Sequence, residues 1–472
     1  MNVEEARMHL TQAIACTERA SLRAKIAAVL ACAAPFAASA VPVIPQGAGY
    51  GMDTPAGRGG VVHRVTNLNA SGPGSLTACA KATGPRVCVF EVSGVIRLTA
   101  DINIVSPNIT IAGQTAPSPG IMIRGAGINI GASDVLLQHL RIRPGDAADG
   151  PDSGNRDALK ISAAAPFKNI VVDHCSFSWA MDETVSLWSN WDNVTISNSI
   201  ISEGLYWQPE EGHSSGYGML IGPRDSRVTV MGNLFAHNRD RNPLTRAKQF
   251  VFVNNVVYNH LTTALQLQSE NGLVTNNTIL GNVFLRGPDT GERYTSVIVR
   301  TDAELGLPTA SKVYVADNAA SEVASGNDWS IVSAYSGSVA PSLKTALPPT
   351  WPAGLTRLPT SENVVLEQTL KYAGARPADR DSVDTRVVKS VRDRSGRIIT
   401  CVSPNGTARC SKNAGGWPTL AQNTRPLTLP ANHNEVTPSG YTRLELWLHA
   451  MAAQVEGRPT QPPTAPVLAN DR

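Results

Sequence analysis

The chain has 472 residues, of which 17% are charged and 5% aromatic, and its formal net charge is +3. Such a small charge, without a lysine- and arginine-rich run, argues against a nucleic-acid-binding protein. Glycine, valine, asparagine, serine and threonine are plentiful, which favours an all-β protein of strands and turns around a sizeable core. The length allows two or three domains, although all-β architectures of this size also fold as one unit.

Residues 1–40 have the pattern of a signal peptide. Arg19, Arg23 and Lys25 precede the apolar run IAAVLACAAPFAA, and the small-residue cleavage site ASA follows at residues 38–40. A membrane anchor is the alternative, but the apolar run is short for a bilayer span, and no later segment is suited to one. We therefore expect a secreted protein, extracellular or periplasmic, with no membrane span.

The cysteines that remain after the signal peptide fit an exported protein. Cys79 is close in sequence to Cys88, and Cys401 is close to Cys410, so each pair could close a local disulfide loop in an oxidising compartment. Cys175 is left over and is interpreted as a small buried thiol. None of the cysteines has the C-x-x-C spacing of a zinc site.

From about residue 105 to residue 320 the chain repeats a short apolar strand followed by a polar corner, at several intervals of 22 to 24 residues. Such a period without intervening helices is typical of a parallel β-solenoid, in which a repeated corner asparagine can hydrogen-bond along the stack. A β-sandwich is the alternative, but its turns recur every 8 to 12 residues or so. The aligned apolar column is Ile111, Leu137, Val172, Ile196, Val230, Phe252, Val274 and Val315. The corner column three positions later is Cys175, Ser199, Asn233, Asn255, Asn277 and Asn318.

The domain organisation follows from this repeat. We expect the β-solenoid over residues 41–345 and an irregular, Pro-rich C-terminal extension over residues 346–472 that packs on it. Near its end the extension contains one short amphipathic helix, YTRLELWLHAMAAQ, and then the Pro-rich tail RPTQPPTAP.

Stacking the coils brings five segments onto one face, where we expect an acidic cluster beside a basic one. They are DALKIS from Asp157, DETVSLW from Asp182, YGMLIG from Tyr217, RNPLTR from Arg241 and TALQLQ from Thr263. Acids on adjacent coils repel one another unless a cation lies among them, and clustered oxygen ligands are what Ca²⁺ prefers. Arginines suit a substrate that carries carboxylates, which a guanidinium group binds bidentately.

These segments resemble the pectate lyases of polysaccharide lyase family 1, in a secreted bacterial branch. VVDHCSFSW is similar to the family's WIDH segment, RNPLTR matches its R-x-P-x-x-R, YGMLIG its K-A-M-L-I-G-like strand, and DETVS its D-G-L-I-D segment. GRGGVVHRVTNLNASGPGSLTACA, ARPADRDSVDTR and AGGWP also resemble pieces of this branch, so that the likeness covers roughly residues 45 to 420.

The resemblance implies a right-handed parallel β-helix that cleaves α-1,4-polygalacturonate by calcium-dependent β-elimination and gives 4,5-unsaturated oligogalacturonides. It makes Arg241 the base that removes the proton from sugar carbon 5, and Arg246 a ligand of the substrate carboxylate. An arginine base is unusual because a guanidinium group hardly gives up its proton, so it would need neighbouring cations and alkaline pH. The partner is an acidic polysaccharide, and we expect a monomer.

The resemblance makes Asp157, Asp182, Glu183 and Ser186 the calcium ligands, and Arg246, Tyr217 and His213 the substrate contacts. The chain departs from the family pattern once in each set. Ser186 replaces the second acid of the D-G-L-I-D segment, and Glu183 is placed to compensate. Tyr217 stands where the family has a lysine, and His213 is the nearby residue that would partly replace the missing cation. Asp173 and His174 are interpreted as a buried hydrogen-bonded pair that braces the calcium face.

Other functions remain open at this point. A lyase that acts on another uronate polysaccharide or on methylated pectin would use the same residues. A hydrolase on the same fold would need paired acids at an inverting spacing, whereas the acids here cluster beside arginines. A carbohydrate-binding β-helix without activity is the alternative outside the enzymes.

Overall fold

The computed structural model describes residues 41–206, 215–292, 294–321, 328–358, 362–404 and 410–459. All of them belong to one compact unit, Val41–Arg472. The predicted signal peptide, His213 and most of the Pro-rich tail lie outside the described residues. Within the described ranges, none of the helices combines the length and the apolar character needed to cross a bilayer.

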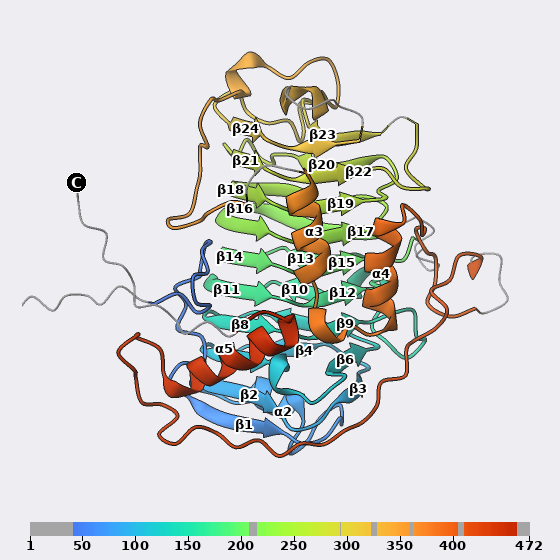
Figure 1. Cartoon of the computed structure of the whole chain (residues 1–472). Helices are drawn as coiled ribbons and strands as arrows, with labels where there is room; N and C mark the ends of the chain where they lie inside the picture. Colours follow the sequence, from blue (N-terminus) through green and yellow to red (C-terminus); the bar gives the residue numbers. More distant parts are fainter. Residues whose placement is uncertain are drawn as a thin grey trace, which may run out of the picture. The chain divides into compact units, whose positions relative to one another are not determined.

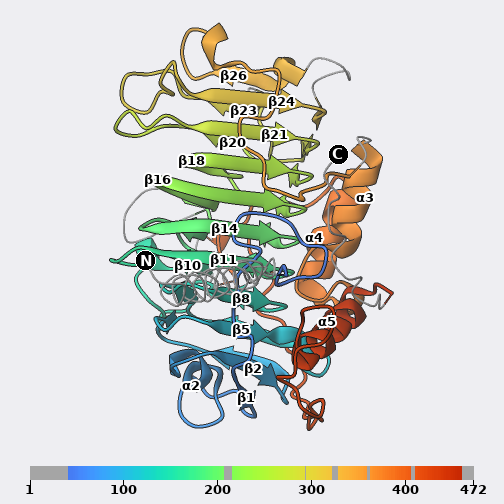
Figure 2. The same cartoon turned by 90° about the vertical axis from the view of Figure 1, so that its left-hand side faces the viewer.

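The strands form three stacks, and every pairing between named strands is parallel (Figures 1 and 2). The β2 stack contains β1 (Val61–Val65), β2 (Arg86–Phe90), β5 (Ile109–Ala112), β8 (Val135–Gln138), β11 (Phe167–Asp173), β14 (Trp191–Ser197), β16 (Tyr217–Met231), β18 (Leu244–Val253), β21 (Asn276–Leu280) and β24 (Lys312–Ala316). The β13 stack contains β4 (Ile102–Ile104), β7 (Ile128–Ile130), β10 (Leu159–Ile161), β13 (Glu183–Leu187), the first residues of β16 and β18, β20 (Thr263–Leu267), β23 (Thr295–Val299) and β26 (Val332–Ala334). The β15 stack contains β3 (Gly94–Arg97), β6 (Ile121–Arg124), β9 (Arg141–Arg143), β12 (Ser176–Ser178), β15 (Ile200–Ser202), β17 (Leu234–Ala236), β19 (Val256–Tyr258), β22 (Val283–Leu285) and β25 (Ala319–Ala320). This is the parallel β-helix that the repeat predicts.

The apolar column of the repeat lies inside the coils. Strand register joins its members from Ile111 to Phe252 in the predicted order, and all of them are buried. The prediction of Val274 is wrong: Phe252 pairs with Ile279, which pairs with Val315, while Val274 lies before the strand and is 40% exposed. Since side chains alternate between the two faces of a strand, this register buries the apolar set of each coil against the next.

An asparagine ladder runs along the corner between the β2 and β15 stacks. The Nδ2 of Asn233 donates to Oδ1 of Asn255 at 3.0 Å, and Asn255 donates in the same way to Asn282 at 3.1 Å. Asn282 continues the ladder to Asn318 at 2.9 Å. The predicted member Asn277 is therefore wrong, and Asn282 takes its place. Each rung satisfies corner backbone groups that would otherwise be buried without a partner.

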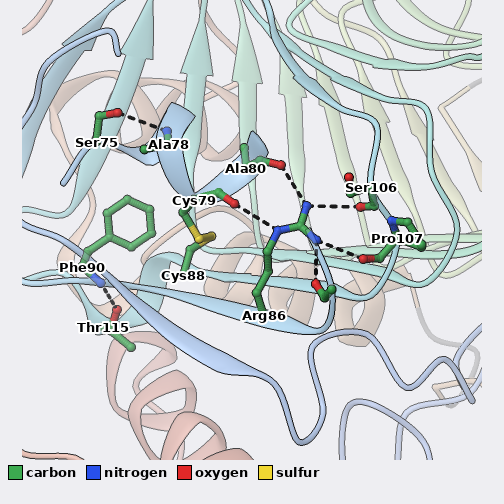
Figure 3. Close-up of a disulfide and its surroundings, with 11 residues drawn as sticks. Ser75, Ala78, Cys79, Ala80, Arg86, Cys88, Phe90, Ser106, Pro107 and Thr115 are labelled. Carbon is green, nitrogen blue, oxygen red and sulfur yellow. Dashed lines mark hydrogen bonds between the residues drawn. A yellow bond between two sulfur atoms is a disulfide. The ribbon is translucent and has the colours of Figure 1, made fainter. Parts of the chain in front are cut away.

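The first coils are closed by the short helix α2 (Leu76–Lys81) and by a disulfide between Cys79 and Cys88 (Figure 3). Arg86 is fully buried beside it. Its guanidinium group donates to the carbonyl oxygens of Cys79, Ala80, Gly84, Ser106 and Pro107 at 2.8–3.1 Å. This one side chain therefore satisfies backbone acceptors of the helix, of a turn and of the next coil. A second disulfide joins Cys401 to Cys410, and Cys175 is free and buried.

The C-terminal extension contains more helix than the sequence pattern predicts. The expected helix is α5 (Arg443–Glu456), which begins with a capping box between Thr442 and Glu445 and ends at Gly457 in the left-handed conformation. Two helices were not predicted, α3 (Glu362–Tyr372) and α4 (Ser382–Arg392). Asp381 caps α4, and both Asp381 and Asp384 form buried ion pairs with Arg143 of β9, at 2.5 and 2.6 Å.

The helices cover two of the three outer surfaces of the coil (Figures 1 and 2). The apolar residues of α3 and α4 pack on the outer side of β15, β17, β19 and β22. Leu444 and Leu448 of α5 pack on Val87 and Val89 of β2. Among the described residues, neither of these two clusters includes a residue of β10, β13 or β20.

Candidate active site

The five segments predicted to share a face do lie on consecutive strands of the β13 stack. Lys160 pairs in register with Ser186, and Glu183 pairs with Tyr217 on the next coil. Tyr217 in turn forms an isolated parallel β-bridge with Asp240, the residue directly before the RNPLTR segment. Leu244 of that segment pairs with Gln266 of β20. The register therefore sets the acids of β10 and β13 beside the arginines that lead into β18.

Asp157, Asp182 and Glu183 form the acidic cluster at the start of these strands. One carboxylate oxygen from each lies within 4.8 Å of the others. Ser186 donates its hydroxyl to Oδ2 of Asp157, whereas the buried Oδ1 of Asp157 has no hydrogen-bond partner. Burial raises the pKa of Asp157 to about 7, and the negative charge of Asp182 contributes to this rise. The hydrogen bond from Ser186 acts in the opposite direction.

This cluster has the donor set of a hard divalent cation. Carboxylate and hydroxyl oxygens are the groups that Ca²⁺ prefers, and the unpartnered Oδ1 of Asp157 is a buried acceptor that a cation would satisfy. Burial also raises the pKa of Glu183, with the charge of Asp157 adding to it and that of Arg241 opposing it. Three carboxylates held this close store repulsion that a bound cation removes.

Arg241 lies between the acidic cluster and Tyr217. Its Nη1 forms an ion pair with Glu183, and the guanidinium carbon lies 3.7 Å from the centre of the Tyr217 ring. The backbone of Arg241 is left-handed (φ 57°), and its amide donates to the carboxylate of Asp240 at 2.8 Å. The side chain keeps 25% of its surface exposed, so the group is positioned and still reachable from solvent. Tyr217 thus orients Arg241 by a cation–π contact.

Arg246 follows on the outer side of β18. Its Nε donates to Gln268 at 3.0 Å, and its Nη1 pairs with Glu270 at 2.6 Å. Both partners come from the residues directly after β20, which ends at Leu267. Gln268 and Glu270 were not predicted as site residues, although their place at the end of the TALQLQ strand was the available signal.

Asp240 is a further site residue that the sequence analysis missed. It accepts hydrogen bonds from the Arg241 amide and from Nε2 of Gln266, the latter at 2.7 Å. Burial raises the pKa of its carboxyl group despite these bonds and the neighbouring arginines. Its place directly before the arginine motif was the available signal.

Asp173 and His174 do form the predicted buried pair, with 2.7 Å between Oδ2 and Nδ1. The prediction that they brace the calcium face is wrong. They lie at the corner between β11 and β12, where Gln138, Ser197, Asn198 and the α5 residue Glu456 contact them. The turn from one strand to the next points these side chains towards α5 and away from the β13 stack.

Comparisons with known proteins agree with the fold. A family model described as "Right handed beta helix region" matches residues 153–301. "Probable pectate lyase C" of Aspergillus flavus is 34% identical over 88% of this chain and 94% of its own length, and its namesake from Neosartorya fischeri is 33% identical over 88% and 95%. The major allergen of cedar pollen, a solved structure, is 19% identical with a TM-score of 0.49 and covers 68% of this chain and 91% of its own. The two pectate lyase relatives are fungal proteins, so the expected bacterial branch finds no support in them.

Proposed function

The chain belongs to the pectate lyase family, and from this premise we propose that it cleaves α-1,4-linked polygalacturonate by calcium-dependent β-elimination. One observation carries the proposal: an acidic cluster with an unpartnered carboxylate oxygen lies on the same strand stack as Arg241, which is paired with a member of that cluster. The products would be 4,5-unsaturated oligogalacturonides. We further propose that the protein is secreted and acts as a monomer, and its two disulfides support secretion.

Asp157, Asp182 and Glu183 would hold the calcium ion, with Ser186 orienting Asp157. A calcium ion bound there would supply positive charge that offsets the substrate carboxylate and makes the carbon 5 proton more acidic. The chain's own residues then perform the proton transfer and the positioning.

Arg241 is the proposed base. In the elimination the base takes the proton from carbon 5, the electrons of that bond form the double bond between carbons 4 and 5, and oxygen 4 leaves with its bonding pair and takes up a proton. A guanidinium group can accept the proton only when it is itself deprotonated. The ion pair with Glu183 opposes that deprotonation, so Glu183 must be neutralised before Arg241 works as a base.

Arg246 is the proposed ligand of a substrate carboxylate. Gln268 and Glu270 fix two of its nitrogens, which holds the plane of the guanidinium group and lowers the entropy lost on binding. Tyr217, at the position of the expected lysine, contacts Arg241 and adds no positive charge of its own. His213 stays a proposed substrate contact, although it lies outside the described residues.

A metal-removal experiment on polygalacturonate tests the proposal. Activity, followed by the ultraviolet absorbance of the unsaturated product, should disappear in excess chelator and return with added Ca²⁺. Polygalacturonate should be cleaved faster than highly methylated pectin, because methylation removes the carboxylates that Arg246 and the metal would bind. Full activity in chelator would contradict the calcium site, and a preference for methylated pectin would contradict the substrate assignment.

A further inference from the structure

A second cluster of potential metal ligands lies away from the β13 stack, at the corner between the β2 and β15 stacks. His139 follows β8 and His174 follows β11, and they occupy the same corner on successive coils because Gln138 pairs in register with Asp173. Both residues have a left-handed backbone, and their rings stack with centroids 5.3 Å apart and planes 13° apart. The fold therefore aims two imidazole rings in the same direction.

Hydrogen bonds fix the same tautomer in both rings. The Nδ1 of His139 lies 2.8 Å from the carbonyl oxygen of Ala375, and the Nδ1 of His174 lies 2.7 Å from Oδ2 of Asp173. Both partners can only accept, so each Nδ1 must carry its proton and donate. The lone pair of a neutral ring then lies on Nε2, and both Nε2 atoms are buried without a hydrogen-bond partner.

Glu456, the last residue of α5, brings a carboxylate to these two nitrogens. Its Oε1 lies 3.5 Å from Nε2 of His139, and its Oε2 lies 3.6 Å from Nε2 of His174. Both distances exceed those of ordinary N–H···O hydrogen bonds. They are close to the separation of about 3.3–3.5 Å between two ligand atoms of a tetrahedral zinc ion with bonds of 2.0–2.1 Å.

We infer that His139, His174 and Glu456 form a binding site for a divalent transition-metal ion of the zinc type, distinct from the acidic cluster on the β13 stack. Two imidazole nitrogens and a carboxylate suit such an ion, whereas Ca²⁺ takes oxygen ligands. Asp173 would orient His174 from behind and the carbonyl of Ala375 would orient His139, which is the usual second layer of support in histidine metal sites.

The site opens to solvent on one side. His174, Asp173 and Glu456 line a groove of about 660 Å³, which gives an ion a path in and leaves room for a water molecule as fourth ligand. Arg458 also lines the groove, and its Nε lies 3.1 Å from Oε2 of Glu456. Arg458 therefore competes with a metal for that oxygen, while Oε1 faces His139. A bound ion would fasten α5 to the strand corner.

Zinc titration of the full-length protein tests the inference. The protein is stripped with chelator, dialysed into buffer with excess Ca²⁺ so that the acidic cluster is occupied, and titrated with Zn²⁺ by calorimetry. One equivalent of Zn²⁺ should bind per chain, and Co²⁺ in its place should give visible absorption bands of a four- or five-coordinate ion. Absence of a stoichiometric site under these conditions would overturn the inference.

Three variants decide whether these residues hold the ion. Glu456→Gln should weaken Zn²⁺ binding by about tenfold or more. Asp173→Asn should weaken it by about 10–100-fold, because Asp173 orients the ring of His174. Arg458→Gln should strengthen binding, because it removes the competitor for Glu456. Glu435→Gln, which changes an exposed partner of Arg443, is the control and should bind zinc as the wild type does.

The variants are checked for folding by circular dichroism and for lyase activity in zinc-free, calcium-containing buffer, so that failure of the zinc site is separated from failure of the proposed function. Unchanged zinc affinity in folded Glu456→Gln, or weaker zinc binding in Arg458→Gln, would show that the cluster is an ion pair between α5 and the strand corner and no metal site.

Discussion

Asp157→Asn should stabilise the metal-free protein above neutral pH, although it removes a proposed calcium ligand. Asp157 is buried, and its pKa is raised from 3.8 to about 7. A group whose pKa is raised in the folded state contributes stability that is fully present below the unfolded pKa and is lost as pH rises through the folded pKa. The full shift corresponds to about 4 kcal/mol. Asparagine has no charge to bury and keeps an oxygen that can accept the hydrogen bond of Ser186.

Urea denaturation in excess chelator, measured from about pH 4 to pH 8, checks this prediction. The stability of the variant minus that of the wild type should grow by at most about 1.4 kcal/mol per pH unit and become constant above about pH 7. With Ca²⁺ at 100 times its dissociation constant the advantage of the variant should shrink by about 2.7 kcal/mol, because the ion stabilises the wild type by that amount.

Asp192→Asn is the matched control. The hydrogen bonds and charge of Arg227 outweigh partial burial and lower the pKa of Asp192, so that substitution should destabilise the protein as pH rises. If the two variants show the same pH dependence, or if Asp157→Asn is less stable than the wild type in chelator at pH 8, the assigned burial of charge at Asp157 is wrong.

Three further predictions concern the active site. Arg241→Lys should lower kcat by about 10²–10⁴-fold or more. Arg246→Lys should mainly raise KM, by an amount that corresponds to about 1–3 kcal/mol of lost binding free energy. Similar losses of kcat in both variants would contradict the separate roles. Ser186→Asp should tighten Ca²⁺ binding by adding a carboxylate beside Asp157, and an unchanged calcium titration would remove Ser186 from the site. Glu183→Gln, assayed at saturating Ca²⁺, should move the rising limb of the pH–rate profile towards lower pH, because Arg241 loses its anionic partner; a profile that stays in place would show that this ion pair does not control the base.

The sequence predicted the coil register well wherever the repeat is uninterrupted. From Ile111 to Phe252 the apolar column is correct, because an apolar residue in each coil must face the same core. It fails after Phe252, where the turn containing Asn271 and Gly272 shifts the next strand, and the adjacent Asn276 and Asn277 imitate the corner asparagine. A local pattern cannot measure the length of an inserted loop.

The site residues were predictable as a set and unpredictable as pairs. Strand spacing was enough to place Asp157, Asp182 and Arg241 on one face. The ion pair between Arg241 and Glu183 and the contact with Tyr217 depend on side-chain directions across two coils, which the repeat does not specify. The cluster around His174 was harder still, because Glu456 comes from α5, whose docking lies outside the repeat.

The most direct test of the central claim is the ultraviolet absorbance of polygalacturonate digested by wild-type protein and by Arg241→Lys, both with saturating Ca²⁺ at alkaline pH. Elimination creates one carbon–carbon double bond for every linkage broken, so we predict that absorbance rises in proportion to new reducing ends for the wild type and is nearly lost for the variant. New reducing ends without a rise in absorbance would identify a hydrolase, and a folded Arg241→Lys protein with most of its turnover would contradict the assignment of Arg241 as the base.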